Sequence, residues 1–192
     1  MSMTLDERLN AILPRITSED FLHSKGLGNE IGFWVFDYPP EDELAVRAFV
    51  LEVVEPALKR RTPAIRSHTV NLFDTIVGLL RTRDLLDKAV AMQHTKGDEA
   101  LHTSLRSVLK EDRLAQRLID AVDLSETDLL MVTGVGASYP LLRTHTLLNA
   151  LHAKMGAVPL LLFFPGHYDG FTLRLFSRLP DDHYYRAFRL VD

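Results

Sequence analysis

The spacing of hydrophobic residues changes period several times along the first half of the chain, and each period predicts a different element. Thr4 to Leu13 places its apolar residues on one helical stripe, while Ile31 to Phe36 is an unbroken apolar run typical of a buried strand. From Glu41 to Leu58 the spacing is helical again, with acidic residues early and basic residues late. A short alternating segment, Ile65 to Thr69, predicts a second strand that changes into a helix near Asn71.

The second half alternates between helical and strand patterns. The region from Arg83 to Val122 repeats apolar residues at helical spacing, so we expect it to be mostly helical with an interruption near Gly97. After it, Leu129 to Thr133 predicts a strand, Pro140 to Met155 a helix and Pro159 to Phe164 another strand. Such a β-α-β unit implies parallel strands joined by a right-handed crossover.

The last segments differ, because both Phe171 to Phe176 and Tyr184 to Leu190 alternate polar and apolar residues around a Pro-Asp-Asp turn. They predict an antiparallel edge hairpin. No low-complexity linker or repeat divides the chain. We therefore expect a single α/β domain over residues 1–192, with a helical insertion at about 83–122. Its sheet would be mostly parallel (mixed) and flanked by helices, Rossmann-like or like a degenerate P-loop fold.

Composition narrows the functional classes. The 192 residues are 46% hydrophobic, enough for one substantial core, and the net charge of -4 supplies no general basic field for nucleic acid. Direct nucleic-acid binding is therefore disfavoured. The absence of cysteine excludes disulfides and thiolate metal sites. With a charged N-terminus and no apolar run longer than Val158 to Phe164, we expect a soluble, cytoplasmic protein without membrane contact.

The glycine turn Gly134-Val135-Gly136 is the first candidate ligand site, because it follows a strand and precedes a helix, where an anion can bind. The residues after it, through Tyr139 and Pro140, supply neither the lysine of a P-loop nor the third glycine of a dinucleotide site. A tight strand-to-helix turn is therefore favoured over a nucleotide site, which stays the alternative.

Three polar residues in the following helix, Arg143, His145 and Asn149, form a candidate anion clamp beside that turn. The alternative, a structural hydrogen-bond network at the end of the sheet, is favoured. His145 and His152 have no carboxylate near them on this helix, so the pattern does not support a metal site.

A second polar turn contains Gly166, His167, Tyr168 and Asp169 after the next strand. His167 and Asp169 could act as an acid-base pair, but no nucleophile has a suitable context and Pro-Gly and Asp-Gly are common turn residues. The turn interpretation is again favoured, and no catalytic residue is assigned.

Near the C-terminus, Tyr184, Tyr185 and Arg186 have the composition of a partner contact. A tyrosine pair with one ring buried and one exposed explains them equally well.

Five segments of the sequence carry a resemblance to a known family. They are LGNEIGFWVFDYPPEDELAVR from Leu27, NLFDTIVGLL from Asn71, GVGASYPLLRTHTLLNALH from Gly134, PLLLFFPGHYDGFTLRLF from Pro159 and YYRAFRLVD from Tyr184. Together they resemble the BrxB family of the BREX bacteriophage-exclusion systems, in the same order and over nearly the whole chain.

The resemblance implies a component of a phage-defence operon that methylates host DNA and blocks phage DNA replication. It implies no established enzymatic activity and no cofactor. The family occurs beside PglZ, which is alkaline-phosphatase-like, the methyltransferase PglX and the ATPase BrxC. A scaffold or adaptor role, with PglZ as the favoured partner, is the natural hypothesis. A nucleotide- or anion-sensing protein or enzyme that uses the turn at Gly134 to Gly136 is the alternative.

Overall fold

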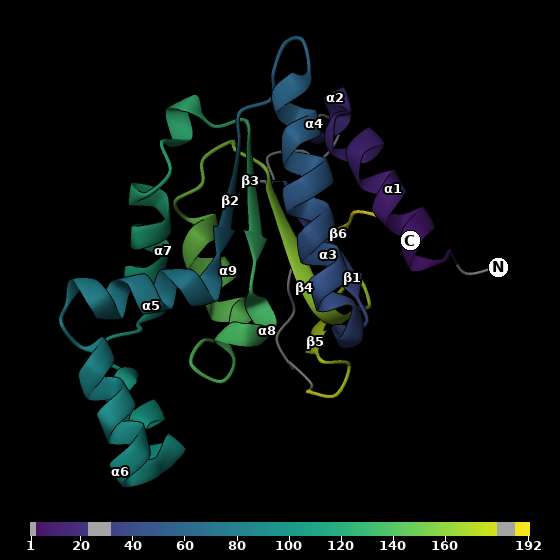
Figure 1. Ribbon diagram of the computed structural model, residues 1–192. Coiled ribbons are helices and arrows are strands. Elements are labelled where there is room, and N and C mark those ends of the chain that lie inside the picture. The colour runs from purple at the N-terminus through teal and green to yellow at the C-terminus, as the bar shows by residue number, and fades with distance from the viewer. Residues whose placement is uncertain (1–2, 23–31, 180–186) are drawn as a thin grey trace.

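The computed structural model describes residues 3–22, 32–179 and 187–192, and these build one central sheet between two layers of helices (Figure 1). The strands run in the order β2-β3-β4-β1-β6, and all neighbours in that order are parallel. β5 pairs antiparallel with the end of β4. The strands are β1 (Phe33–Tyr38), β2 (Ser67–Asn71), β3 (Leu129–Thr133), β4 (Leu160–Tyr168), β5 (Leu173–Leu175) and β6 (Phe188–Arg189).

One helical layer comes from the N-terminal part of the chain. It consists of α1 (Leu5–Ile16), α2 (Glu19–Leu22), α3 (Glu43–Phe49), the π-helical turn η2 (Val50–Val54) and α4 (Glu55–Arg60), after the short 3-10 turn η1 (Pro40–Asp42). Val46, Val50, Val54 and Leu58 point from this layer into a core shared with Phe36 of β1. The spacing of four residues keeps these side chains on one face, which explains why this segment forms a single covering helix.

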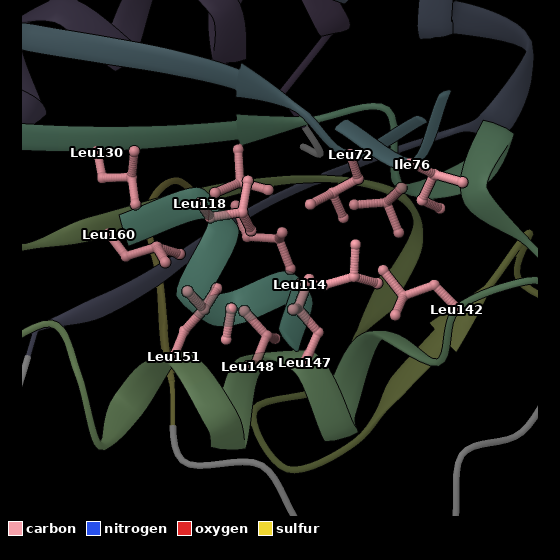
Figure 2. Packing of buried hydrophobic residues seen from close by; sticks show 14 of the residues in the cluster. Leu72, Ile76, Leu114, Leu118, Leu130, Leu142, Leu147, Leu148, Leu151 and Leu160 are labelled. Atoms are coloured by element: carbon pink, nitrogen blue, oxygen red, sulfur yellow. The ribbon is translucent and has the colours of Figure 1, made fainter. Parts of the chain in front are cut away.

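The other layer covers the opposite face and comes from the chain between β2 and β4. It contains α5 (Leu72–Thr82), α6 (Leu86–Leu105), α7 (Glu111–Asp120), the 3-10 turn η3 (Leu124–Glu126), α8 (Val135–Ser138) and α9 (Thr144–His152). Figure 2 shows leucines of α5, α7 and α9 packed against Leu130 and Leu160 of the sheet. α6 bends at Gly97 (φ 82°) and projects from the body (Figure 1).

The order of the strands brings the carboxyl ends of β1 and β4 together. After β1 the chain crosses one face to reach the far edge at β2, and then returns over the other face through β3 to β4, which lies beside β1. Loops that leave neighbouring strands toward opposite faces open a crevice between them. The candidate site lies there.

The predicted fold class is confirmed, with a mostly parallel α/β sheet flanked by helices. Both early strands, the change into a helix at Leu72, the helical region of residues 83–122 with its break at Gly97, and the strand Leu129–Thr133 all occur as expected. None of the helices within the described ranges is both long and apolar enough to cross a membrane.

The predicted helix from Pro140 to Met155 is wrong at its start. The structure has the single turn α8 before the proline, and α9 begins only at Thr144. Tyr139 adopts an extended conformation (ψ 139°). A residue that precedes proline is disfavoured in the helical region, so the chain leaves the helix there and restarts after Arg143.

The predicted pairing of Phe171 to Phe176 with Tyr184 to Leu190 is also wrong. β5 instead folds back on β4 to form the antiparallel hairpin, and β6 joins the sheet as a parallel neighbour of β1. The side chain of Asp169 accepts hydrogen bonds from the backbone N–H groups of Phe171 and Thr172, which closes a tight turn directly after β4. The segment that follows therefore lies back on β4.

Candidate functional site

Asp37 lies at the centre of the crevice, near the carboxyl end of β1, and is 5% exposed. Its Oδ1 accepts a hydrogen bond from Arg8 Nη2 at 2.7 Å, and its Oδ2 accepts one from the backbone N–H of Tyr168 at 2.9 Å. Arg189 Nη2 lies 3.5 Å from the same Oδ2. The carboxylate is thereby joined to α1, β4 and β6.

Arg8 is held in place by more than this ion pair. Its guanidinium also donates to the backbone carbonyls of Asp37 (2.7 Å) and Val191 (3.2 Å), and it stacks over the ring of Phe36 at 5.0 Å from the centroid. Charge-assisted hydrogen bonds and cation-π contacts of this kind fix a side chain in one orientation. The pair Arg8-Asp37 is therefore a rigid floor of the crevice.

A cleft of about 970 Å³ lies above that floor, between the ends of β1, β4 and β5. His167 lines it, half-exposed, with Nδ1 3.6 Å from Asp37 Oδ2. Arg174 and Arg178 are exposed at its rim. The rim thus carries two arginines and the carboxylate of Glu41, and the buried carboxylate of the floor is engaged by arginine.

The Gly134 turn is filled by a side chain of the protein. Gly134 has φ 73°, and a Cβ there would collide with Oδ1 of Asn71. The same oxygen accepts hydrogen bonds from the backbone N–H groups of Phe73 (3.0 Å) and Asp74 (3.2 Å), so it caps α5. Glycine is required here because the cap of a neighbouring helix occupies the space over the turn.

The two predicted glycine turns meet at Phe176. A Cβ on Gly136 would lie 3.0 Å from the Phe176 ring, and one on Gly166 would lie 3.0 Å from the backbone N of Phe176 and collide with the carbonyl of Arg174. Tyr139 packs edge-on against the same ring, with centroids 6.1 Å apart. The structure therefore brings Gly136, Tyr139 and Gly166 together around an aromatic side chain.

The three candidate clamp residues have different environments. Arg143 is the exposed N-cap of α9, and Asn149 is exposed farther along the helix. His145 is 7% exposed. Two of the three side chains therefore face solvent, and one belongs to the interior.

Tyr168 and Asp169 hold the β4–β5 connection. The phenol oxygen of Tyr168 lies 2.8 Å from the carbonyl of Ala187 and 3.0 Å from that of Gly170. Hydrogen bonds from the backbone N–H of Thr172, from its hydroxyl and from the backbone N–H of Phe171 lower the pKa of Asp169 to about 2. The ring of His167 approaches Asp37, and its predicted pairing with Asp169 stays a prediction.

Sequence reasoning did not single out Arg8, Asp37 or Arg189 as site residues. Arg8 is 29 positions from Asp37 and Arg189 is 152 positions away. A carboxylate at the end of a buried strand was the available signal, since such a group needs a partner. Tyr184, Tyr185 and Arg186 lie outside the described residues. Among the described ranges there is no cluster of three or more histidine, aspartate or glutamate side chains that could hold a metal ion.

Fold and site together define a class of protein. It is a mostly parallel α/β protein in which side chains of the protein itself bind the polar groups and fill the glycine turn at the carboxyl ends of the strands. The sequence model described as BREX protein BrxB matches residues 63–190. A protein of Bacillus cereus (strain H3081.97) named BREX protein BrxB is 40% identical over 192 residues, covering 98% of both chains. One of Escherichia coli O9:H4 (strain HS) with the same name is 38% identical over 187 residues, covering 97% of this chain and 92% of its own. The chain belongs to the BrxB family. No solved structure matches it significantly.

Proposed function

We propose that this protein is a non-catalytic component of a BREX bacteriophage-defence system, where it acts as an adaptor or scaffold for other BREX proteins. PglZ is the first partner to test, followed by PglX and BrxC. Membership of the BrxB family supports the place in a BREX system. The observation that carries the non-catalytic role is the engagement of the strand-end positions by Asn71 over Gly134 and by Arg8 on Asp37.

Acid-base catalysis requires a titratable group within reach of a substrate. Both oxygens of Asp37 are engaged by protein donors and the side chain is buried, while Asp169 is turned toward its own backbone. Neither carboxylate is presented as a base. The exposed arginines of the cleft, Arg174 and Arg178, can bind a negative charge without performing a reaction.

The adaptor role predicts a stable complex between this chain and PglZ. Both proteins from one operon are co-expressed and applied together to size-exclusion chromatography at micromolar concentration. We expect one co-eluting species with defined stoichiometry. Elution as separate species at that concentration would contradict an adaptor role that uses PglZ. The same experiment would then be repeated with PglX and with BrxC.

The second candidate is a nucleotide or anion sensor that uses the turn at Gly134 to Gly136. It is less well supported because the amide of Asn71 already fills the space over Gly134, and because α8 has a single turn. Thermal unfolding with ATP, GTP and dinucleotides separates the candidates, since a ligand that binds only the folded state raises the Tm. We expect no shift at millimolar ligand, whereas a rise that is lost in Arg143→Ala would favour the sensor.

A further inference from the structure

β2 is the outermost strand on one side of the sheet, and it has no strand beside its outer edge among the described residues. Its five residues, Ser67 to Asn71, contain no charged side chain and no proline. Proteins usually protect such an edge with charges, prolines or a bulge. This edge carries neither a charge nor a proline, which leaves its backbone able to pair.

The alternation of the strand shows which backbone groups face outward. The carbonyl of Arg66 accepts a hydrogen bond from Asp128 N at 2.8 Å, so the main-chain groups of Arg66 face β3. Successive residues of a strand direct their main-chain groups to opposite sides, so those of Ser67 and Thr69 face the open edge. The buried hydroxyl oxygens of these two residues also have no hydrogen-bond partner among the described residues.

A groove of about 590 Å³ runs beside this edge. One wall comes from η2 and α4, with Leu51 and Glu55, and the other from α5 and α7, with Gly78 and Leu118. Leu51 is 54% exposed, so its side chain is accessible to an apolar partner group. The groove thus follows a strand edge between two helical walls, and it contains an exposed apolar anchor.

Gly78 shows that the groove has room at its α5 wall. A Cβ on this residue would meet no atom within 4 Å, unlike one on Gly134 or Gly166. Gly78 has no positive φ that would demand glycine, and glycine in the middle of a helix costs stability. The open space over α5 is therefore a property of the groove.

We propose that an extended polypeptide segment of a BREX partner protein binds in this groove and adds a strand to the outer edge of β2. This inference rests on the adaptor role proposed above and assigns that role a surface. Main-chain hydrogen bonds to Ser67 and Thr69 supply affinity, and an apolar side chain of the segment packs on Leu51. Addition of a strand to an open edge is a common mode of peptide recognition.

The charge of the groove favours such a segment over a small charged ligand. Its rim carries Arg47 and Arg117 on one hand and Glu55 and Asp74 on the other, so the charges balance. Five residues of strand extend over about 17 Å at 3.3 Å per residue, which suits a short peptide. A main chain carries no net charge and presents donors and acceptors alternately, as the edge does.

The test uses the full chain, tagged and co-expressed with the other proteins of its BREX operon, and measures the partner recovered with it. Gly78→Phe fills the groove, and Gly78→Ala at the same position is the matched control. Thr69→Pro removes an N–H group that faces the open edge. A sheet tolerates proline at such a position, because the lost N–H makes no hydrogen bond to a neighbouring strand. Ala153→Phe places the same ring at an exposed site just after α9.

We expect Gly78→Phe and Thr69→Pro to lower partner recovery at least about tenfold, and Gly78→Ala and Ala153→Phe to retain it. Circular dichroism melting verifies that each variant is folded, and hydrogen exchange of the wild-type complex should show the amides of Ser67 and Thr69 newly protected. Undiminished recovery with folded Gly78→Phe would overturn the inference and leave the adaptor role standing. Failure of the wild type to recover any BREX protein would overturn both. A homodimer that Gly78→Phe dissociates would assign the edge to a second copy instead.

Discussion

Asp37 is the residue on which the two ends of the described chain converge. Arg8 from α1, Arg189 from β6 and the backbone N–H of Tyr168 all approach its carboxylate. Because the side chain is buried, each of these groups compensates for the loss of water around the negative charge. The contacts of Asp37 at the floor of the cleft therefore stabilise the fold.

Asp37→Asn should destabilise the protein strongly. The substitution removes the charge that compensates the largely buried Arg8, and breaking one side of a buried ion pair costs about 3–5 kcal/mol. Urea unfolding followed by circular dichroism measures the loss. Glu41→Gln changes an exposed carboxylate on the same cleft and should alter the free energy of unfolding by less than about 0.5 kcal/mol. Equal stability of Asp37→Asn and the wild type would show that the ion pair is not formed in solution.

Asp169 gives the protein a defined response to acid. Hydrogen bonds from Thr172 and Phe171 lower its pKa from 3.8 to about 2, so the folded state prefers the charged carboxylate. The stabilisation is present above pH 3.8 and is lost as the pH falls toward 2. Because Asp169 is exposed, we expect the free energy of unfolding to fall by less than about 1 kcal/mol over this range.

Carbon NMR of the Asp169 carboxyl measures this pKa directly, and Asp169→Asn should flatten the pH dependence of unfolding between pH 4 and pH 2. A carboxyl that titrates near 3.8 would mean that the β4–β5 turn is open in solution.

Among the elements, the strand-to-helix turn after β3 shows how closely local and tertiary structure are coupled. Gly134 lies in the left-handed region, and Asn71, which caps α5 after β2, packs directly on it. Two neighbouring strands therefore pass into their helices through one shared contact. The glycine serves that contact, so its place in the turn is explained without a phosphate ligand.

Gly134→Ala should lower the free energy of unfolding by at least about 2 kcal/mol, from backbone strain together with the collision with Asn71. Gly156→Ala is the matched control, because Gly156 also has positive φ (60°) but nothing lies within 4 Å of its Cβ position. We expect the control to cost about 1 kcal/mol from strain alone.

The collision can be isolated with Asn71→Ala, which by itself should cost about 1 kcal/mol as the loss of a helix cap. In the double variant the collision is gone, so its loss should be smaller than the sum of the single losses by about 0.5–3 kcal/mol. Strict additivity would place the two residues out of contact.

The elements that could be predicted from the sequence are those whose pattern is local. β1 and β3 are short apolar runs, and a single residue, Gly97, predicts the break of α6. β5 pairs with the end of β4 that extends beyond β1, and β6 pairs with β1; which partner is available to each is decided by the whole chain. The site divides in the same way: the glycine turns are visible in the sequence, whereas the approach of Arg8 to Asp37 requires the fold.

In the whole molecule, the two edges of the sheet differ in how far other segments cover them. On the β6 side, the C-terminal segment packs Phe188 against Trp34 at 5.3 Å between centroids, Leu190 N donates to Val35 O, and α1 reaches Val191 through Arg8. On the β2 side, the groove follows an edge that no described strand covers. One edge therefore stabilises the fold, and the other is available for association.

Removal of residues 187–192 should therefore destabilise the protein without changing the groove. Leu190 and Val191 are buried, at 4% and 8% exposure, and each contributes about 1.5–3 kcal/mol of apolar burial. We expect a loss of about 3–6 kcal/mol in urea unfolding, while removal of the exposed Asp192 alone should have almost no effect. Below the Tm of the truncated chain, its recovery of BREX partners should equal that of the wild type, because β2 lies at the opposite edge. Partner recovery that disappears in a folded, truncated chain would instead place the binding surface on the C-terminal side of the sheet.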